Sequence, residues 1–221
     1  MDHKFWMNCW TTNAIGFHES SPNGLLRDHF SSFSNKVAPK RVLVPMCGKS
    51  LDMPWLMAQG CHVVGVELSD IAIHDFFKSL NITPAVKALD TLTLYSAPKI
   101  DIFVGDLFHL TSPLVGTIDA IYDRAALVAW DPKHRNAYVN HLIDISGMAP
   151  QLVNIFQHPT QDNPQHPVFN EGPPFLILPS EIRALYESTY LVAPIQHAPS
   201  ERTIRDTIVH ECLWQCIPHE I

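Results

Sequence analysis

Short apolar runs rich in β-branched residues alternate with stretches of helical hydrophobic spacing, and this alternation limits the possible folds more than any other feature. Strand-like runs fall at 41–45, 62–67, 100–105, 117–122 and 150–156, and helical patterns begin near residues 51, 70, 131 and 180. Such alternation is typical of right-handed βαβ units around a parallel sheet. Two later runs, 190–196 and 207–216, predict an antiparallel C-terminal edge. We therefore expect an α/β fold with a mostly parallel central sheet flanked by helices.

The length of the chain suits one core. With 221 residues, 46% of them hydrophobic, the chain can bury a good core without dividing into two domains. We find no repeat and no linker, so we expect a single domain over 1–221. Residues 1–35 form an aromatic N-terminal segment that we expect to act as a lid. We expect a proline-rich loop over 158–178, because five prolines fall within 157–175. Loops of this length in compact domains are usually functional or flexible.

Charge and hydropathy exclude several classes of partner. Fifteen basic and 22 acidic residues give a net charge of −7, and no run of Lys or Arg is present, so we expect no nucleic-acid partner. The N-terminus lacks the apolar core of a signal peptide, and no stretch of about 18 apolar residues is present to span a bilayer. We expect a cytoplasmic monomer that acts on small molecules and contacts no membrane.

The cysteines and histidines do not predict a metal site. Five cysteines without a CxxC pair suit reduced thiols better than a disulfide framework. His210, Cys212, Cys216 and His219 are residue types that zinc accepts. The alternative is a late strand, in which His210, Cys212 and Cys216 share one face at period two and spread over about 20 Å, too far for one ion. We expect the strand and no metal.

The segment "VLVPMCGKSL", residues 42–51, resembles the end of a phosphate-binding loop but lacks an essential part of it. That loop needs a glycine five residues before Gly48, and Leu43 stands there. What remains is a strand, a tight turn and a helix start with Ser50 as a plausible N-cap. This arrangement is the general place where α/β proteins hold a ligand, at the carboxyl end of a strand.

Glu67 ends the second predicted strand, nineteen residues after Gly48. An acid at that place accepts hydrogen bonds from ribose hydroxyls in nucleoside-binding folds, since a carboxylate is acceptor-only and can hold two hydroxyls. The alternative is an exposed glutamate at a strand end. Because no GxGxxG cradle for a pyrophosphate is present, a nucleoside cofactor without phosphates fits better than NAD, and S-adenosylmethionine is the commonest of these.

Five motifs follow one another along the chain: "FWMNCWTTNAIGFHES" (5–20), "VLVPMCGKSLDMPWL" (42–56), "VVGVELSDIAI" (63–73), "YDRAALVA" (122–129) and "GPPF" (172–175). Together they resemble the thiopurine S-methyltransferase family, especially its bacterial members. Their order is kept from about residue 5 to about residue 216. The resemblance implies a Rossmann-like methyltransferase fold with S-adenosylmethionine as the methyl donor and S-adenosylhomocysteine as the product.

The resemblance also implies site residues. The cofactor contacts of the family fall on Trp6, Trp10, Met46, Glu67, Asp106, Leu107 and Arg124, and the positions lining the acceptor side fall on Phe17 and Arg124. The alternatives are core aromatics for the two tryptophans and a structural surface pair for Asp123 and Arg124. The chain departs from the family pattern in three places: Met46 stands where leucine is usual, "IFQHPTQD" replaces an acidic and aromatic patch, and the loop before Gly172 is longer.

The resemblance implies methyl transfer to the sulfur of a small aromatic or heterocyclic, thiopurine-like thiol. A thiolate is already a good nucleophile, so the chain needs mainly to align and desolvate the reactants, with no catalytic nucleophile and no metal. If a base takes part, Asp123 or His158 is a candidate. Two alternatives remain: the acceptor is a selenium or tellurium species, or the protein binds S-adenosylmethionine without catalysis.

Overall fold

The computed structural model describes residues 2–157, 172–195, 200–204 and 206–219. They form two compact units: an amino-terminal unit, Asp2–Ile121 with Ile145–Gly147, and a carboxy-terminal unit, which holds Tyr122–Asp144 and the described residues from Met148 onward. Strand β6 (Ala120–Arg124) passes from the first unit into the second. The expectation of one domain over 1–221 stays a prediction. Within these ranges no helix has the length and apolar character needed to cross a membrane.

The amino-terminal unit is built on a sheet with the strand order β3-β4-β5-β2-β1-β6. Strand β2 pairs in parallel with β1 and β5, β1 pairs in parallel with β6, and β4 pairs antiparallel with β3 and β5. Val63, Val64 and Val66 of β2 are almost fully buried, as expected of a parallel strand covered on both faces. The bounds are β1 Arg41–Pro45, β2 His62–Glu67, β3 Ala85–Ala88, β4 Thr93–Ala97 and β5 Ile100–Val104.

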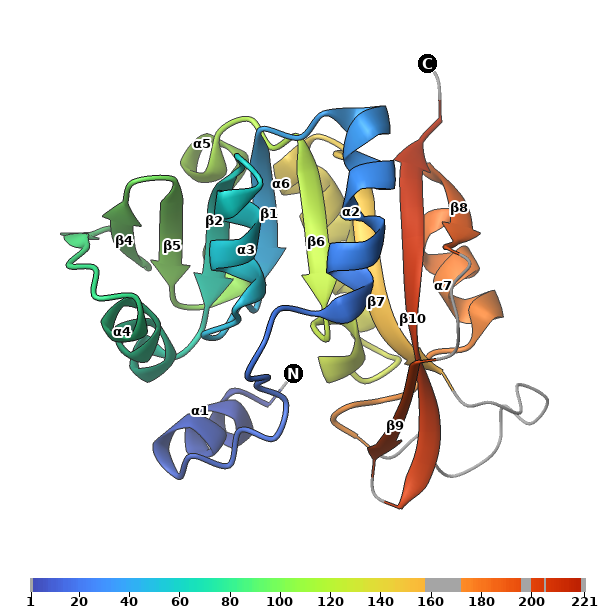
Figure 1. Ribbon diagram of the computed structural model, residues 1–221, viewed down its shortest axis with the longest axis horizontal. Coiled ribbons are helices and arrows are strands. Elements are labelled where there is room, and N and C mark those ends of the chain that lie inside the picture. The colour runs from blue at the N-terminus through green and yellow to red at the C-terminus, as the bar shows by residue number, and fades with distance from the viewer. Residues whose placement is uncertain (1, 158–171, 196–199, 205, 220–221) are drawn as a thin grey trace. The chain divides into compact units, whose positions relative to one another are not determined.

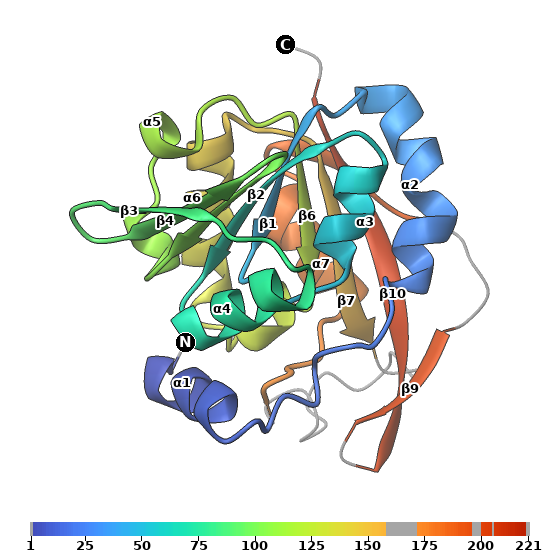
Figure 2. The same cartoon turned by 60° about the vertical axis from the view of Figure 1, so that its left-hand side comes forward.

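The helices of this unit pack around the sheet, and two of them lie where its central strands end. Helix α3 packs on β2, α4 contacts β2 and β5, and α1 lies against α4. Figures 1 and 2 show α1 and α4 on the side of the sheet where β1 and β2 end. The bounds are α1 His3–Thr11, α2 Gly24–Val37, α3 Asp52–Ala58, α4 Asp70–Ser79, η1 Leu107–His109 and α5 Ser112–Val115.

The carboxy-terminal unit follows the order β6-β7-β10-β8, with β9 paired to β10. The long strand β10 is antiparallel to β7, β8 and β9. Helix α7 packs on β8 (Figure 1). The bounds are η2 Leu127–Ala129, α6 Arg135–Ser146, β7 Gln151–Gln157, α7 Pro179–Tyr186, β8 Tyr190–Pro194, β9 Ser200–Ile204 and β10 Thr207–Pro218.

A buried arginine fixes the "GPPF" segment in this unit. Arg135, at the start of α6, has a fully buried side chain. Its Nε donates to the carbonyl of Trp130 at 3.1 Å, and its two terminal nitrogens donate to Glu181 at 2.5 Å and to the carbonyls of Phe175 and Leu176 at 3.4 Å. A buried guanidinium is tolerated only when paired in this way. The pairing ties the chain after Gly172 to α6 and α7.

Asp123 is the buried acid of the same unit. Its carboxylate is fully buried and accepts hydrogen bonds from the Leu127 N–H at 3.0 Å and the Tyr138 hydroxyl at 2.7 Å. Burial raises the pKa of Asp123 to about 6, although these hydrogen bonds act in the opposite direction. The interpretation of Asp123 and Arg124 as a surface pair is therefore wrong, because the carboxylate faces the interior.

The predicted fold class is confirmed: the central strands are parallel, and β10 with its neighbours forms the antiparallel C-terminal edge. The strand prediction for 207–216 is also confirmed by β10. Strands β3, β4 and β9 were not predicted; all four residues of β3 are exposed, so no buried alternation marks it. Residues 1–35 contain α1 and most of α2, which the sequence left unassigned.

Three predicted boundaries are wrong for local reasons. The helix expected from Asp131 begins at Arg135, because the Asp131 carboxylate binds Lys133 N and His134 Nδ1 in a preceding turn. The strand expected at 117–122 begins at Ala120, since Asp119 accepts from the backbone N–H groups of Lys40 and Arg41. Ser50 does accept from Asp52 N at 3.2 Å, but the N-cap residue of α3 is Leu51.

The burial of Asp123 predicts a pH-dependent stability difference for Asp123→Asn. The folded pKa near 6 exceeds the unfolded value near 4, so the native state gains stability as this carboxyl protonates below pH 6 and loses that gain as pH rises through 6. The effect of Asp123→Asn on the free energy of unfolding should therefore be more favourable at pH 7.5 than at pH 5, by about 1 to 2 kcal/mol.

Urea unfolding at the two pH values measures this difference, with the exposed Asp90→Asn as the control for losing one carboxylate. An effect of Asp123→Asn that is equal at pH 5 and pH 7.5 would show that the Asp123 carboxyl ionises normally.

Candidate active site

Glu67, the last residue of β2, joins the turns that follow two neighbouring strands. Its side chain is 6% exposed; Oε2 accepts from Gly48 N and Oε1 from Ser69 N, each at 2.9 Å. The Glu67 carbonyl also accepts from Gly105 N, just after β5, at 2.9 Å. The alternative of an exposed strand-end glutamate is wrong, because this residue is buried and holds the ends of β1, β2 and β5 together.

The Glu67 carboxylate retains the capacity to bind hydroxyl groups. Burial raises its pKa, and the hydrogen bonds from the N–H groups of Ser69, Gly48 and Leu68 counteract part of that rise. Each carboxylate oxygen has two acceptor positions, and one backbone N–H occupies only one of them. The arrangement therefore suits a ligand that presents two neighbouring hydroxyls.

The turn after β1 requires an unusual backbone. Met46 and Gly48 both have positive φ, 48° and 51°. A Cβ on Gly48 would lie 3.0 Å from the ring of Trp10, so the position needs glycine both for its φ and for the close approach of the indole. Trp10 therefore packs directly on the turn that Glu67 holds.

Three aromatic side chains form a group beside this turn. The ring centroid of Phe17 lies 5.5 Å from that of Trp6 and 5.4 Å from that of Trp10, both edge to face. Trp10 is 6% exposed, whereas Phe17 is 36% exposed. We call Trp6, Trp10 and Phe17 the aromatic group; it joins a buried ring to one that solvent or a ligand reaches.

The loop after β5 meets the start of α1. Asp106 caps η1 by accepting from Phe108 N at 2.9 Å, and its Oδ2 lies 3.7 Å from His3 Nε2. Leu107 follows as a buried residue. Helix α1 is therefore linked to the loop after β5 through His3 and to the turn after β1 through Trp10.

The structure thus brings together most of the residues expected at the site. Seven of them lie in the amino-terminal unit, around the ends of β1, β2 and β5: Trp6, Trp10, Phe17, Met46, Glu67, Asp106 and Leu107. Arg124 is half-buried at the end of β6 in the carboxy-terminal unit, and its role stays a prediction. His158 lies outside the described residues. Both oxygens of Asp123 are engaged, which fits a structural role better than that of a base.

Sequence reasoning missed two residues of this region. Ser69 is fully buried, donates its N–H to Glu67, and has a hydroxyl without a hydrogen-bond partner among the described residues. Lys49 forms an ion pair with Asp75 at 2.9 Å, and its Nζ lies over the Trp10 ring, 5.9 Å from the centroid. Ser69 could have been found from its position two residues after the acid that ends a strand. For Lys49 the sequence offered only the Gly-Lys-Ser motif, which was set aside because the phosphate-binding loop lacks its first glycine.

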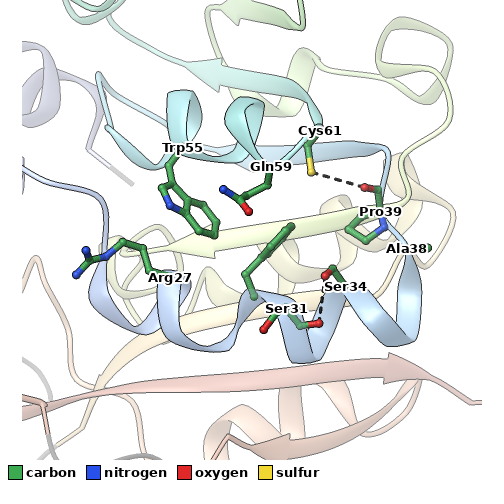
Figure 3. Close-up of a pocket in the computed structure, with 9 residues that line it drawn as sticks. Arg27, Ser31, Ser34, Ala38, Pro39, Trp55, Gln59 and Cys61 are labelled. Carbon is green, nitrogen blue, oxygen red and sulfur yellow. Dashed lines mark hydrogen bonds between the residues drawn. The ribbon is translucent and has the colours of Figure 1, made fainter.

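A pocket of about 290 Å³ between α2 and α3 is not part of this site (Figure 3). Its lining includes Pro39 and Cys61, at the starts of β1 and β2, whereas Glu67 lies at the end of β2. Two of its polar side chains bind the chain itself, Cys61 Sγ to the Pro39 carbonyl and Ser34 to the Ser31 carbonyl, and Arg27 points away from the hollow in Figure 3.

The cysteines near the aromatic group are buried thiols. Cys9 precedes Trp10 and Cys47 precedes Gly48, and burial raises the pKa of both, well above the usual value for Cys47. Within the described part of the chain, no three His, Cys, Asp or Glu side chains come close enough to hold a metal ion.

Comparison with known proteins identifies the family. A family model described as thiopurine S-methyltransferase matches residues 1–207. The chain is 43% identical over 201 residues to a thiopurine S-methyltransferase of Xanthobacter autotrophicus, covering 90% of each chain. It is 44% identical over 190 residues to one of Teredinibacter turnerae, covering 86% of this chain and 85% of the relative.

Solved structures agree on the fold. A Burkholderia thailandensis 1,6-didemethyltoxoflavin-N1-methyltransferase with bound S-adenosylhomocysteine matches with a TM-score of 0.64 at 11% identity, over 99% of this chain and 87% of that one. The magnesium protoporphyrin IX methyltransferase of Synechocystis matches with a TM-score of 0.58 at 14% identity, over 98% and 100%. The predicted Rossmann-like methyltransferase fold is confirmed, and the chain belongs to the thiopurine S-methyltransferase family, whose members are S-adenosylmethionine-dependent methyltransferases.

Proposed function

We propose that the protein transfers a methyl group from S-adenosylmethionine to the sulfur of a small aromatic or heterocyclic thiol. The observation that carries the proposal is the aromatic group beside Glu67 in a chain of this family. We also propose that the protein is a cytoplasmic monomer that acts on small molecules.

The residues present fit S-adenosylmethionine. The Glu67 carboxylate has acceptor positions for a ribose diol, and the buried Ser69 hydroxyl beside it has no partner among the described residues. We assign cofactor binding to Trp6, Trp10, Met46, Glu67, Asp106, Leu107 and Arg124. When bound, S-adenosylmethionine supplies an electrophilic methyl group on a positively charged sulfur. The aromatic group offers this cofactor an apolar surface beside the turn that Glu67 holds.

In the reaction the chain binds the two reactants, orients them and excludes water from them. Phe17 is the most exposed ring of the aromatic group and is the residue that we assign, with Arg124, to the acceptor. An edge-to-face ring suits a planar aromatic acceptor. An aromatic thiol ionises readily, and its thiolate needs no base to react. The rate acceleration therefore comes from aligning the reactants and removing water from the reacting sulfur. This agrees with Asp123 having both oxygens engaged.

The two alternative functions would give different results in a methylation assay. If the acceptor is a selenium or tellurium species, selenite or tellurite is methylated faster than any thiol. If the protein binds S-adenosylmethionine without catalysis, no acceptor is methylated, although family membership favours an enzyme. Incubation with methyl-labelled S-adenosylmethionine and a panel of aromatic thiols, aliphatic thiols, selenite and tellurite separates the three. Turnover highest with aromatic thiols supports the proposal, and turnover confined to selenium or tellurium species contradicts it.

Glu67→Gln should weaken cofactor binding. The amide keeps the size of the side chain but removes the charge and one acceptor oxygen, so the Kd for S-adenosylhomocysteine should rise by about five- to 150-fold, equivalent to about 1 to 3 kcal/mol. Isothermal titration calorimetry measures it. The matched control is Asp101→Asn, since Asp101 is a hydrogen-bonded carboxylate at the opposite, amino end of β5. Equal Kd values for the two folded variants would remove Glu67 from the site.

Phe17→Ala should lower the rate with an aromatic thiol more than it lowers cofactor affinity. Contacts that orient the acceptor act on the transition state, while Glu67 continues to hold the cofactor. We expect kcat/KM for the thiol to fall by about tenfold or more, with the Kd for S-adenosylhomocysteine changed by less than about threefold. Phe5→Ala removes another exposed phenylalanine that packs on Trp6 and is the control. A fall in affinity as large as the fall in kcat/KM would place Phe17 on the cofactor instead.

A further inference from the structure

Lys49 belongs to the Gly-Lys-Ser motif in the turn after β1, which has Leu43 where a phosphate-binding loop needs glycine. Its Nζ lies 2.9 Å from Asp75 Oδ2 on α4 and 5.9 Å from the centroid of the Trp10 ring on α1. The Lys49 side chain is 18% exposed, which is low for a lysine. The residue therefore connects three segments: the turn after β1, α4 and α1.

The ion pair directs the ammonium group onto the indole. A lysine side chain loses considerable rotamer entropy when it is fixed, and the pairing with Asp75 offsets part of that cost. Trp10 is 6% exposed, so one side of the contact is largely free of water. Cation–π attraction strengthens as the partners lose water, and this contact is therefore stronger than one at an open surface.

Trp10 is in turn the residue through which α1 contacts the turn after β1. The helix has nine residues, too few to be stable alone, and its buried residues are Cys9 and Trp10. The Trp10 ring packs on Gly48, meets Phe17 edge to face, and lies under Lys49. Two of these three contacts come from the turn at 46–50, which Glu67 holds through Gly48 N.

We propose that Lys49 is a positioning residue: it holds Trp10, and through it α1, against the turn after β1, and so raises the affinity for S-adenosylmethionine without touching the acceptor. The proposal rests on the assignment of Trp10 to the cofactor in the proposed function. It concerns the cofactor alone, so it holds whichever acceptor the protein uses.

The first test is cofactor affinity. Lys49→Met keeps the length of the side chain and removes its charge, and should raise the Kd for S-adenosylhomocysteine by about three- to tenfold, the range of a partly desolvated cation–π contact. Lys49→Arg keeps a cation that stacks on aromatic rings and should restore the Kd to within about twofold of the wild type. Lys78→Met, an exposed lysine of α4, is the matched control. A Kd for Lys49→Met equal to that of the control overturns the proposal.

The second test asks whether Lys49 acts through Trp10. In a double-mutant cycle, Lys49→Met should change the Kd by less than about 1.5-fold in a Trp10→Leu background, since the ring contact is gone there. An undiminished effect in that background means that Lys49 acts by another route, and overturns the proposal.

The third test needs no ligand and no folded Trp10 variant. Amide hydrogen exchange of α1 in the free protein should be several-fold faster in Lys49→Met than in Lys49→Arg, because the helix loses one of its attachments. Equal exchange in the two variants overturns the proposal. If the wild type binds S-adenosylhomocysteine but methylates no thiol, the proposed function fails while the three Lys49 results still stand.

Discussion

The hydrogen bonds of the Glu67 carboxylate are the interaction on which the site depends. Parallel strands end in separate turns that have no ladder to hold them together, and here one buried side chain binds a backbone N–H from each of two such turns. Two charge-assisted hydrogen bonds offset part of the cost of burying the charge, and the raised pKa of this acid shows that part of that cost remains. The hydrogen bond from Gly48 N to Glu67 also holds the turn on which the Trp10 ring packs.

The sequence predicted the parts of the molecule whose signals are local and apolar. Val63, Val64 and Val66 form a buried run typical of a parallel strand covered on both faces, and Glu67 follows as its last residue. The spacing between Gly48 and Glu67 then placed both at the same edge of the sheet. The family resemblance added the aromatic residues, whose meeting with Gly48 depends on contacts between distant parts of the chain.

Other features left no readable pattern. All residues of β3 are exposed, and its identity as a strand depends on pairing with β4 alone. The N-cap of helix α1 is Asp2, whose carboxylate accepts hydrogen bonds from Lys4 N and Phe5 N. A single aspartate before a short aromatic segment is too weak a pattern to predict this helix. Lys49 and Trp10 are 39 positions apart in the sequence, and they meet because the Trp10 ring packs against Gly48. No local pattern in the sequence predicts such a contact.

The burial of Cys9 and Cys47 has a chemical consequence for an enzyme of this class. A protein that holds an electrophilic methyl donor close to its own backbone risks alkylating its own sulfur, and these two cysteines flank Trp10 and Gly48. Their raised pKa keeps them as neutral thiols at physiological pH, and the thiolate is the reactive form. The sulfur of Cys47 is also tightly packed on the side of β2, since a Cβ on Gly65 would lie only 2.9 Å from it. These two thiols beside the candidate site are therefore poor competitors for a methyl group, and selectivity for an outside acceptor begins with this chemical inertness.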